Sequence, residues 1–194
     1  MVAAAALAIQ PDTTELGPVE DGREAGPGDS RLDALLDLYR RLRIRGSVPR
    51  KMLFDAFVLR PWLGNLAIVE VIAGGHDFRY RLFGTKLVAA AGQDVTGKLI
   101  SQIQGPKRDA ILREYRLAAQ TRKAVTVRAR SLVAQEEMQL ERLVLPLRGG
   151  GRTIDYLLVA IYLSGRDWDS VARTEDGRAA LMGSFVEREV FALD

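Results

Sequence analysis

The chain has 194 residues, a formal net charge of +3 at pH 7, no cysteine and one histidine, His76. The missing cysteines exclude disulfides, cysteine nucleophiles and cysteine-containing zinc sites, and the single histidine excludes motifs that need two. A hydrophobic fraction of 47% and a charged fraction of 27% are typical of a globular domain with a core of its own.

The basic residues are mostly arginine, 23 against 5 lysines, and they are spread along the chain among aspartate and glutamate. A nucleic-acid-binding protein usually gathers its basic side chains into a patch or a stripe. The pattern therefore argues against nucleic acid as a partner, although a nucleic-acid-binding regulator stays open as an alternative.

We expect residues 1–29 to form a disordered leader. Between residues 10 and 29, proline, glycine and acidic residues outnumber large apolar ones, and such a segment buries too little surface to offset its ordering entropy. The apolar run at residues 2–9 is mostly alanine and follows no lysine or arginine, unlike a secretory signal. Since no apolar stretch approaches the roughly 18 residues of a membrane span, we predict a cytoplasmic protein without a span.

The folded domain is expected over residues 30–164 and begins with an amphipathic helix. Ser30 followed by Asp33 is a typical N-cap signal, and apolar side chains then recur at helical spacing over 31–43. The apolar stripe consists of Leu32, Leu35, Leu36, Tyr39 and Leu42. This stripe must pack against another element, either the sheet of the same chain or its copy in a homodimer.

Two strands joined by a glycine turn come next. Residues 66–73 are apolar and β-branched, and a Gly-Gly pair follows them. Residues 77–83 alternate strictly between apolar and polar side chains, which places Phe78, Tyr80 and Leu82 on one face. The pattern predicts a half-buried antiparallel hairpin.

Helical segments and further strands follow this hairpin. Short helical pieces over 84–104 precede a helix over 106–121, whose charged side, with Lys107 and Glu114, is expected to face solvent. Strands are predicted at 124–133, 138–147 and 153–163. Helices that interrupt an antiparallel sheet predict an α+β fold.

The tail over residues 165–194 is polar at first. Apolar residues then recur at helical spacing, and we expect a short amphipathic helix there. Its apolar positions are Leu181, Met182, Phe185 and Val186.

Three segments carry a resemblance to a known family: VPRKMLFDAFVLRPWLGNLAIVEV at 48–71, DFRYRLFGTKLVAAAGQDVTGKLI at 77–100 and ERLVLPL at 141–147. Together with the order of elements they resemble the PAS-like family common in alphaproteobacteria, over about residues 31–164. The resemblance implies a bacterial protein with the PAS fold. That fold is a five-stranded antiparallel sheet of order 2-1-5-4-3, with the helices at 85–121 over one face.

The same resemblance limits which cofactors the chain can be expected to bind. PAS photosensors that hold flavin through a cysteinyl adduct, or coumarate through a thioester, are excluded because the chain lacks cysteine. A haem-binding PAS domain usually takes its ligand from the long helix, and residues 106–121 lack histidine, which argues against haem. Noncovalent flavin stays open, so the cofactor is unknown. We expect His76 to be a surface turn residue.

The candidate ligand site is the set of apolar side chains expected to face the helices. Such side chains line a cavity in a ligand-binding PAS domain and fill it in a scaffold, and the sequence leaves both open. The set consists of Tyr80, Leu82, Leu87, Val88, Val95, Leu99, Ile103, Ile111, Tyr115, Val127 and Leu145.

The function that the resemblance implies is binding rather than catalysis. The sequence shows no cluster of acid, base and nucleophile, and we assign no catalytic or metal-ligating residue. We expect a signalling sensor or adaptor that binds a small molecule, a protein partner or both, and forms a homodimer through Leu32, Leu35, Leu36, Tyr39 and Leu42. A ligand-free interaction scaffold is the alternative, and any output domain is expected in another protein.

Overall fold

The computed structural model of the chain describes residues 28–105, 107–133, 136–164 and 187–193. The α-helices are α1 Ser30–Arg41, α2 Thr85–Ala91 and α3 Arg108–Thr121. The 3-10 helices are η1 Lys51–Leu53, η2 Arg60–Trp62, η3 Ala73–Gly75 and η4 Ile100–Gln102. The strands are β1 Leu66–Ile72, β2 Asp77–Phe83, β3 Ala124–Val133, β4 Glu136–Leu147, β5 Tyr156–Ser164 and β6 Glu187–Leu193.

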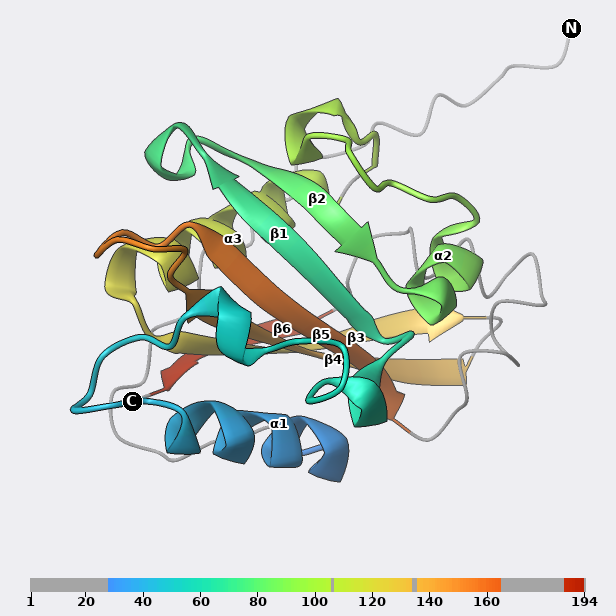
Figure 1. Cartoon of the computed structure of the whole chain (residues 1–194). Coiled ribbons are helices and arrows are strands. Elements are labelled where there is room, and N and C mark those ends of the chain that lie inside the picture. Colours follow the sequence, from blue (N-terminus) through green and yellow to red (C-terminus); the bar gives the residue numbers. More distant parts are fainter. Residues whose placement is uncertain (1–27, 106, 134–135, 165–186, 194) are drawn as a thin grey trace, which may run out of the picture.

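The described strands form one antiparallel sheet of order β2-β1-β5-β4-β3-β6 (Figure 1). The predicted order 2-1-5-4-3 and the α+β class are confirmed. The sequence analysis missed β6, which lies beside β3 and pairs with it from Ala124↔Leu193 to Arg130↔Glu187. The helix predicted through residues 181–186 lies outside the described residues.

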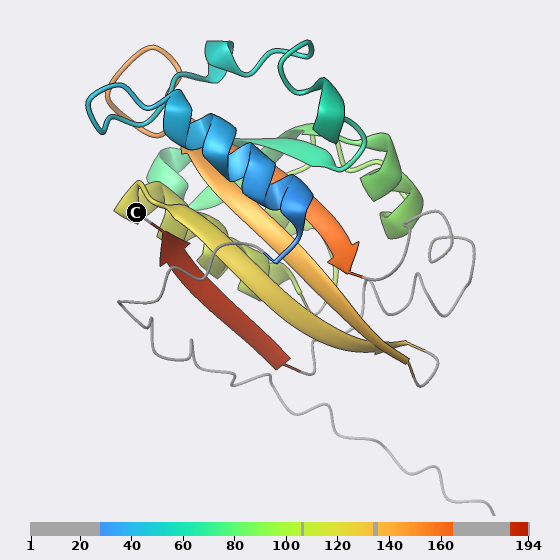
Figure 2. The ribbon, with the colours of Figure 1, turned by 90° about the horizontal axis from the view of Figure 1, so that it is seen from below.

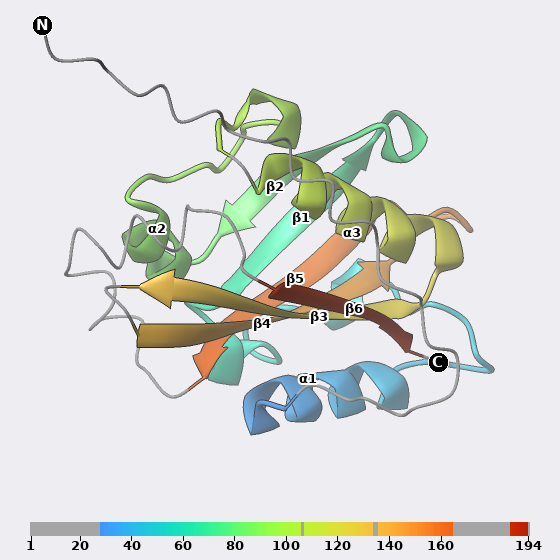
Figure 3. The same ribbon diagram turned by 180° about the vertical axis from the view of Figure 1, so that it is seen from behind.

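Helices cover both faces of the sheet. Helix α1 crosses one face, as the view from below shows (Figure 2). Helix α3, together with α2, covers the opposite face (Figure 3). Each face carries its own apolar core, and alternate residues of every central strand contribute to one core or the other. Among the described residues, no helix is both long and apolar enough to cross a membrane.

The apolar stripe of α1 packs on the sheet of its own chain. Leu32 and Leu35 are fully buried, and Leu36 and Tyr39 nearly so, in a core with residues of β4 and β5. The Tyr39 hydroxyl also donates a hydrogen bond of 3.0 Å to the Pro146 carbonyl oxygen of β4. The assignment of this stripe, with the partly buried Leu42, to a dimer interface is therefore corrected: these side chains belong to the core of the chain.

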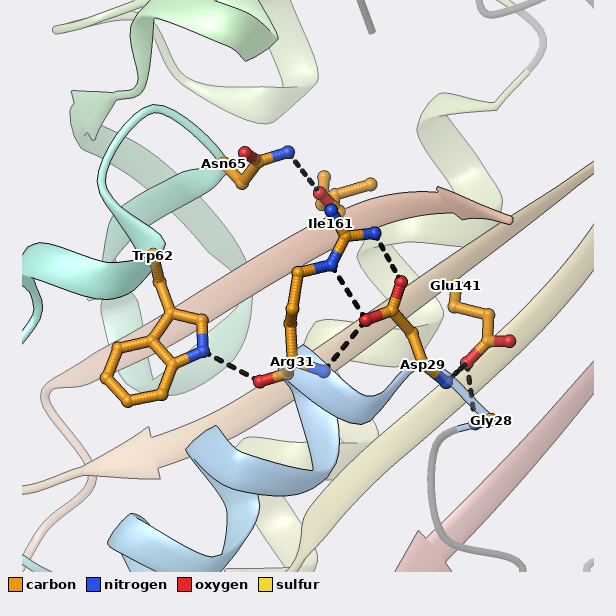
Figure 4. A network of polar contacts seen from close by, with 7 residues as sticks. All are labelled: Gly28, Asp29, Arg31, Trp62, Asn65, Glu141 and Ile161. Atoms are coloured by element: carbon orange, nitrogen blue, oxygen red, sulfur yellow. Dashed lines mark hydrogen bonds and ion pairs between the residues drawn. The ribbon is translucent and has the colours of Figure 1, made fainter. Parts of the chain in front are cut away.

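The start of α1 is fixed by Asp29 and by the sheet, and not by Ser30 as predicted (Figure 4). The Asp29 carboxylate accepts the backbone N–H of Arg31 at 2.9 Å, the usual N-cap bond. The buried Glu141 carboxylate of β4 accepts the backbone N–H groups of Gly28 at 2.7 Å and of Asp29 at 3.1 Å. The helix N-terminus is thus tied to the centre of the sheet.

Two further hydrogen bonds connect the segment before β1 with its neighbours (Figure 4). The Trp62 indole N–H donates to the backbone oxygen of Arg31 at 2.7 Å, and the Asn65 side-chain amide donates to the backbone oxygen of Ile161 at 3.0 Å. The Arg31 guanidinium stacks 3.9 Å from the centre of the Tyr162 ring. The α1 face is therefore closed by apolar packing and by directional polar contacts.

Candidate functional site

A cavity of about 130 Å³ lies on the α3 face of the sheet. Tyr80 and Phe83 of β2 form one wall, and Leu87 and Ala90 of α2 form another. The third wall comes from α3, and the floor from β4 and β5. The residues that supply them are Ile111, Tyr115, Leu140, Arg142 and Ile161. The cavity is mostly apolar and has a few polar side chains in its lining.

Six of the predicted ligand-site residues line this cavity, and five do not. The six are Tyr80, Leu87, Val95, Ile103, Ile111 and Tyr115. Val127 is fully buried in the same core, without forming part of the cavity wall. Val88 and Leu99 are half-buried and lie away from the cavity.

Leu82 was placed on the wrong face because β2 contains a bulge. Ile68 of β1 pairs with Leu82, but the next residue, Val69, pairs with Tyr80, so that Arg81 is the extra residue on β2. The extra residue reverses the alternation beyond it. Leu82 is consequently 40% exposed, and Phe83 lines the cavity in its place.

Leu145 was also placed on the wrong face, because the alternation along β4 was read with the wrong parity. Leu143 and Leu145 pack in the core under α1, whereas Leu140 and Val144 pack in the core under α3. Both faces of β4 are covered, so apolar residues occur at consecutive positions and do not reveal which of them face α3.

A buried ionic cluster lies beside the cavity, and the sequence analysis missed it. Glu114 of α3, predicted to face solvent, is fully buried and accepts a hydrogen bond from the Arg142 guanidinium of β4. Arg188 of β6 lies 3.6 Å from the other Glu114 oxygen. One signal for this cluster was present: Arg142 stands between Leu140 and Val144 on an otherwise apolar face of its strand.

Arg142 joins this cluster to the cavity. Its side chain is 5% exposed and lines the cavity, while one guanidinium nitrogen binds Glu114. Burial acts to lower the pKa of Arg142, but Glu114, Tyr115 and Tyr80 together outweigh burial, and the pKa lies above its ordinary value. The Nε of Arg142 is buried and has no hydrogen-bond partner among the described residues. The cavity wall thus contains a permanent cation.

Lys107 is a second basic group of the cavity wall, and it too was expected to face solvent. It is only 9% exposed. Burial and, secondly, repulsion from Arg142 lower the pKa of Lys107 from 10.5 to about 7, although Glu114 partly opposes both. Its ammonium group therefore gains and loses a proton near neutral pH.

Two tyrosines are further polar residues of the cavity lining. The Tyr80 and Tyr115 side chains interact, and burial raises the pKa of both phenols. Both groups are therefore neutral at physiological pH.

The arrangement suits binding of a compact molecule. The charged side chains that line the cavity are Lys107, Arg108 and Arg142, and none of the described lining residues carries a carboxylate. The described part of the chain also lacks a group of three or more acidic or histidine side chains that could hold a metal ion. Apolar walls with a few convergent polar groups are typical of small-molecule sites.

Comparison with known protein families gives a match. A family model described as PAS domain matches residues 29–161 of the chain, from the N-cap of α1 to β5. The matched range includes every described residue that lines the cavity, whereas β6 with Arg188 follows it. A search of curated proteins found no match to the chain.

Proposed function

The chain belongs to the PAS domain family, and from this premise we propose that it is a sensor that binds a small molecule noncovalently in the cavity beneath α2 and α3. The fold itself is that of signalling sensors and adaptors. The finer assignment rests on one observation, the cavity of about 130 Å³ in the core of the α3 face.

Its size supports an occupant rather than a packing defect. Protein cores pack densely and contain few voids larger than a water molecule. An engineered apolar cavity of roughly 150 Å³ is known to bind benzene. The cavity of this chain is therefore of a size suited to a molecule with one six-membered ring.

An occupant would influence the sheet through the ionic cluster. Arg142 contacts both the cavity and Glu114, and Glu114 lies 3.6 Å from Arg188 of β6. A ligand that binds one arrangement of Arg142 more tightly than another shifts the population of that arrangement. We propose that this shift changes the attachment of β6 to α3, and that this is the output of the sensor.

The test compares ligand binding by the natural chain with ligand binding by a variant whose cavity is filled. Benzene or indole should raise the melting temperature of the natural chain, because a ligand that binds only the folded state stabilises it. The variant Ala90→Leu places a larger side chain in the cavity wall and should abolish the shift. Ala89→Leu, on the exposed side of the same helix, is the matched control and should retain it. No shift in the natural chain would refute the sensor.

A second candidate is an adaptor that works by contact with another copy of the chain. Large apolar side chains are exposed in the segment between α1 and β1, with Met52 74% and Phe57 84% exposed. This segment is a better candidate for the predicted homodimer than the buried stripe of α1. Light scattering of the natural chain and of the double variant Met52→Ser, Phe57→Ser tests it. A dimer that the variant converts to a monomer would support it, and a monomeric natural chain would exclude it.

A further inference from the structure

Resting on the proposed sensor function, we propose that the natural occupant of the cavity is a compact apolar anion, a monocarboxylate with a single ring or a short branched chain. Its carboxylate would lie against Arg142 and Lys107. Its apolar body would lie among the side chains of β2, α2 and η4.

The first argument is the guanidinium of Arg142. It is buried and lines the cavity, and only part of its hydrogen-bonding capacity is used by Glu114. A carboxylate is the acceptor that matches a guanidinium best. Arg142 therefore places a cation suited to a carboxylate at the cavity wall.

The second argument is the charge of the cavity wall. All three charged lining residues, Lys107, Arg108 and Arg142, are basic. Arg108 also contacts the Asp109 carboxylate at 3.0 Å, outside the lining. Glu114, which holds Arg142, does not line the cavity. An anion in the cavity would meet positive charge from β4 and from the start of α3, and would meet no carboxylate among the described lining residues.

The third argument is the mostly apolar lining of the cavity beside a small group of polar side chains. Arg142 interacts electrostatically with both Lys107 and Tyr80, whereas Leu87, Ala90 and further residues of the wall are apolar. A cavity of about 130 Å³ is comparable in volume with one that holds a single ring. Benzoate combines one ring with a carboxylate, and benzamide is its neutral counterpart of equal shape.

The experiment compares benzoate and benzamide by titration calorimetry or protein-observed NMR with the full chain at pH 6.5. Benzoate should bind more tightly than benzamide by about tenfold or more, because its hydrogen bonds to the basic groups are charge-assisted. Lys107→Met should weaken benzoate binding by about tenfold and leave benzamide binding nearly unchanged. Lys51→Met, a lysine that lies over the Tyr156 ring on the α1 side of the sheet and does not line the cavity, is the matched control and should change neither affinity.

The outcomes separate this proposal from the sensor itself. Equal affinities for benzoate and benzamide, or an unchanged benzoate affinity in Lys107→Met, would refute the proposal that the occupant is an anion. Neither result would refute the proposal that the protein is a sensor. Binding of benzene without binding of benzoate would do the same. Failure of benzene, indole, benzoate and benzamide alike would overturn both proposals. Denaturation midpoints of the variants would show that each of them is folded in the assay.

Discussion

Replacing Glu114 with glutamine should destabilise the fold strongly, because it leaves two buried guanidinium groups without their shared carboxylate. Glu114 is fully buried, and the side chains of Arg142 and Arg188 are only 5% and 7% exposed. Glutamine retains the shape of glutamate and one acceptor oxygen, but it cannot balance either positive charge. The perturbation therefore isolates the charge from the packing.

The expected loss follows from this burial. Removing one partner of a buried ion pair costs about 3–5 kcal/mol, since it leaves an uncompensated charge in a poorly solvated site. A domain of this kind has about 5–15 kcal/mol of stability in total. The variant should therefore fold, but with a much lower free energy of unfolding. Exposed ion pairs contribute roughly 0–1 kcal/mol, so Asp37→Asn, which loses a 4.0 Å contact to Arg40 on the surface of α1, is a suitable control.

Urea denaturation at pH 7, followed by circular dichroism, measures both variants. A loss in Glu114→Gln no larger than that in Asp37→Asn would refute the reasoning. The triple variant Glu114→Leu, Arg142→Leu, Arg188→Met supplies a second check, because replacing a whole buried ionic cluster with apolar side chains is often neutral or stabilising. If the triple variant were as unstable as Glu114→Gln, the cost would come from packing and not from unpaired charge.

Three further predictions concern the cavity, the sheet and α1. Benzoate affinity should rise as the pH falls from 8 to 6, because the anion favours protonated Lys107, whose pKa is about 7 in the free protein. Benzoate titrations at several pH values in this range, with Lys107→Met as the control, measure this rise. Arg142 and Glu114 are described groups that act on the pKa of Lys107, and the pKa of Arg142 is moved further above neutrality, so we expect Lys107 to dominate the pH dependence. Leu145→Ala should lower the free energy of unfolding by about 2–5 kcal/mol, and Leu82→Ala by under about 1 kcal/mol, because Leu145 is buried and Leu82 is exposed. Similar losses in urea denaturation would contradict the bulge in β2 that turns Leu82 outward. Asp29→Ala should lower the free energy of unfolding by about 1 kcal/mol at pH 7, because α1 loses its cap. The pKa of Asp29 is lowered in the folded state, so this loss should shrink as acid protonates the carboxylate of the natural chain. A loss that does not depend on pH would contradict the prediction.

The elements could be predicted from the sequence because their patterns are local. The strand at 77–83 ends where its alternation ends, and the apolar spacing of α1 needs no knowledge of the partner on which it packs. The outermost strand β6 was missed because its seven residues follow a long tail and only their pairing with β3 identifies them. A strand of that length has little local signature when its partner lies far away in the sequence.

The cavity could be predicted only in part, because its wall depends on which way each strand faces. One bulged residue, Arg81, turned Leu82 away from the core, and the fully covered β4 concealed the direction of Leu145. The buried charged side chains at and beside the cavity were missed for a different reason. Glu114 and Lys107 have the composition of a solvent-facing helix side, and they are buried because β4 and β6 bring Arg142 and Arg188 against that helix.

The position of β6 also determines what can attach to the rest of the sheet. Its seven residues occupy the hydrogen-bonding edge of β3 from Ala124 to Arg130, an edge that would otherwise be open to strand addition by another chain. The β6 strand lies outside the matched family range, and the Arg188–Glu114 contact joins it to α3. Strand β6 thus occupies that edge, and an extended peptide that pairs with the same edge of β3 must first displace β6. The buried Arg188–Glu114 contact therefore adds to the pairing with β3 in keeping this edge closed to an external strand.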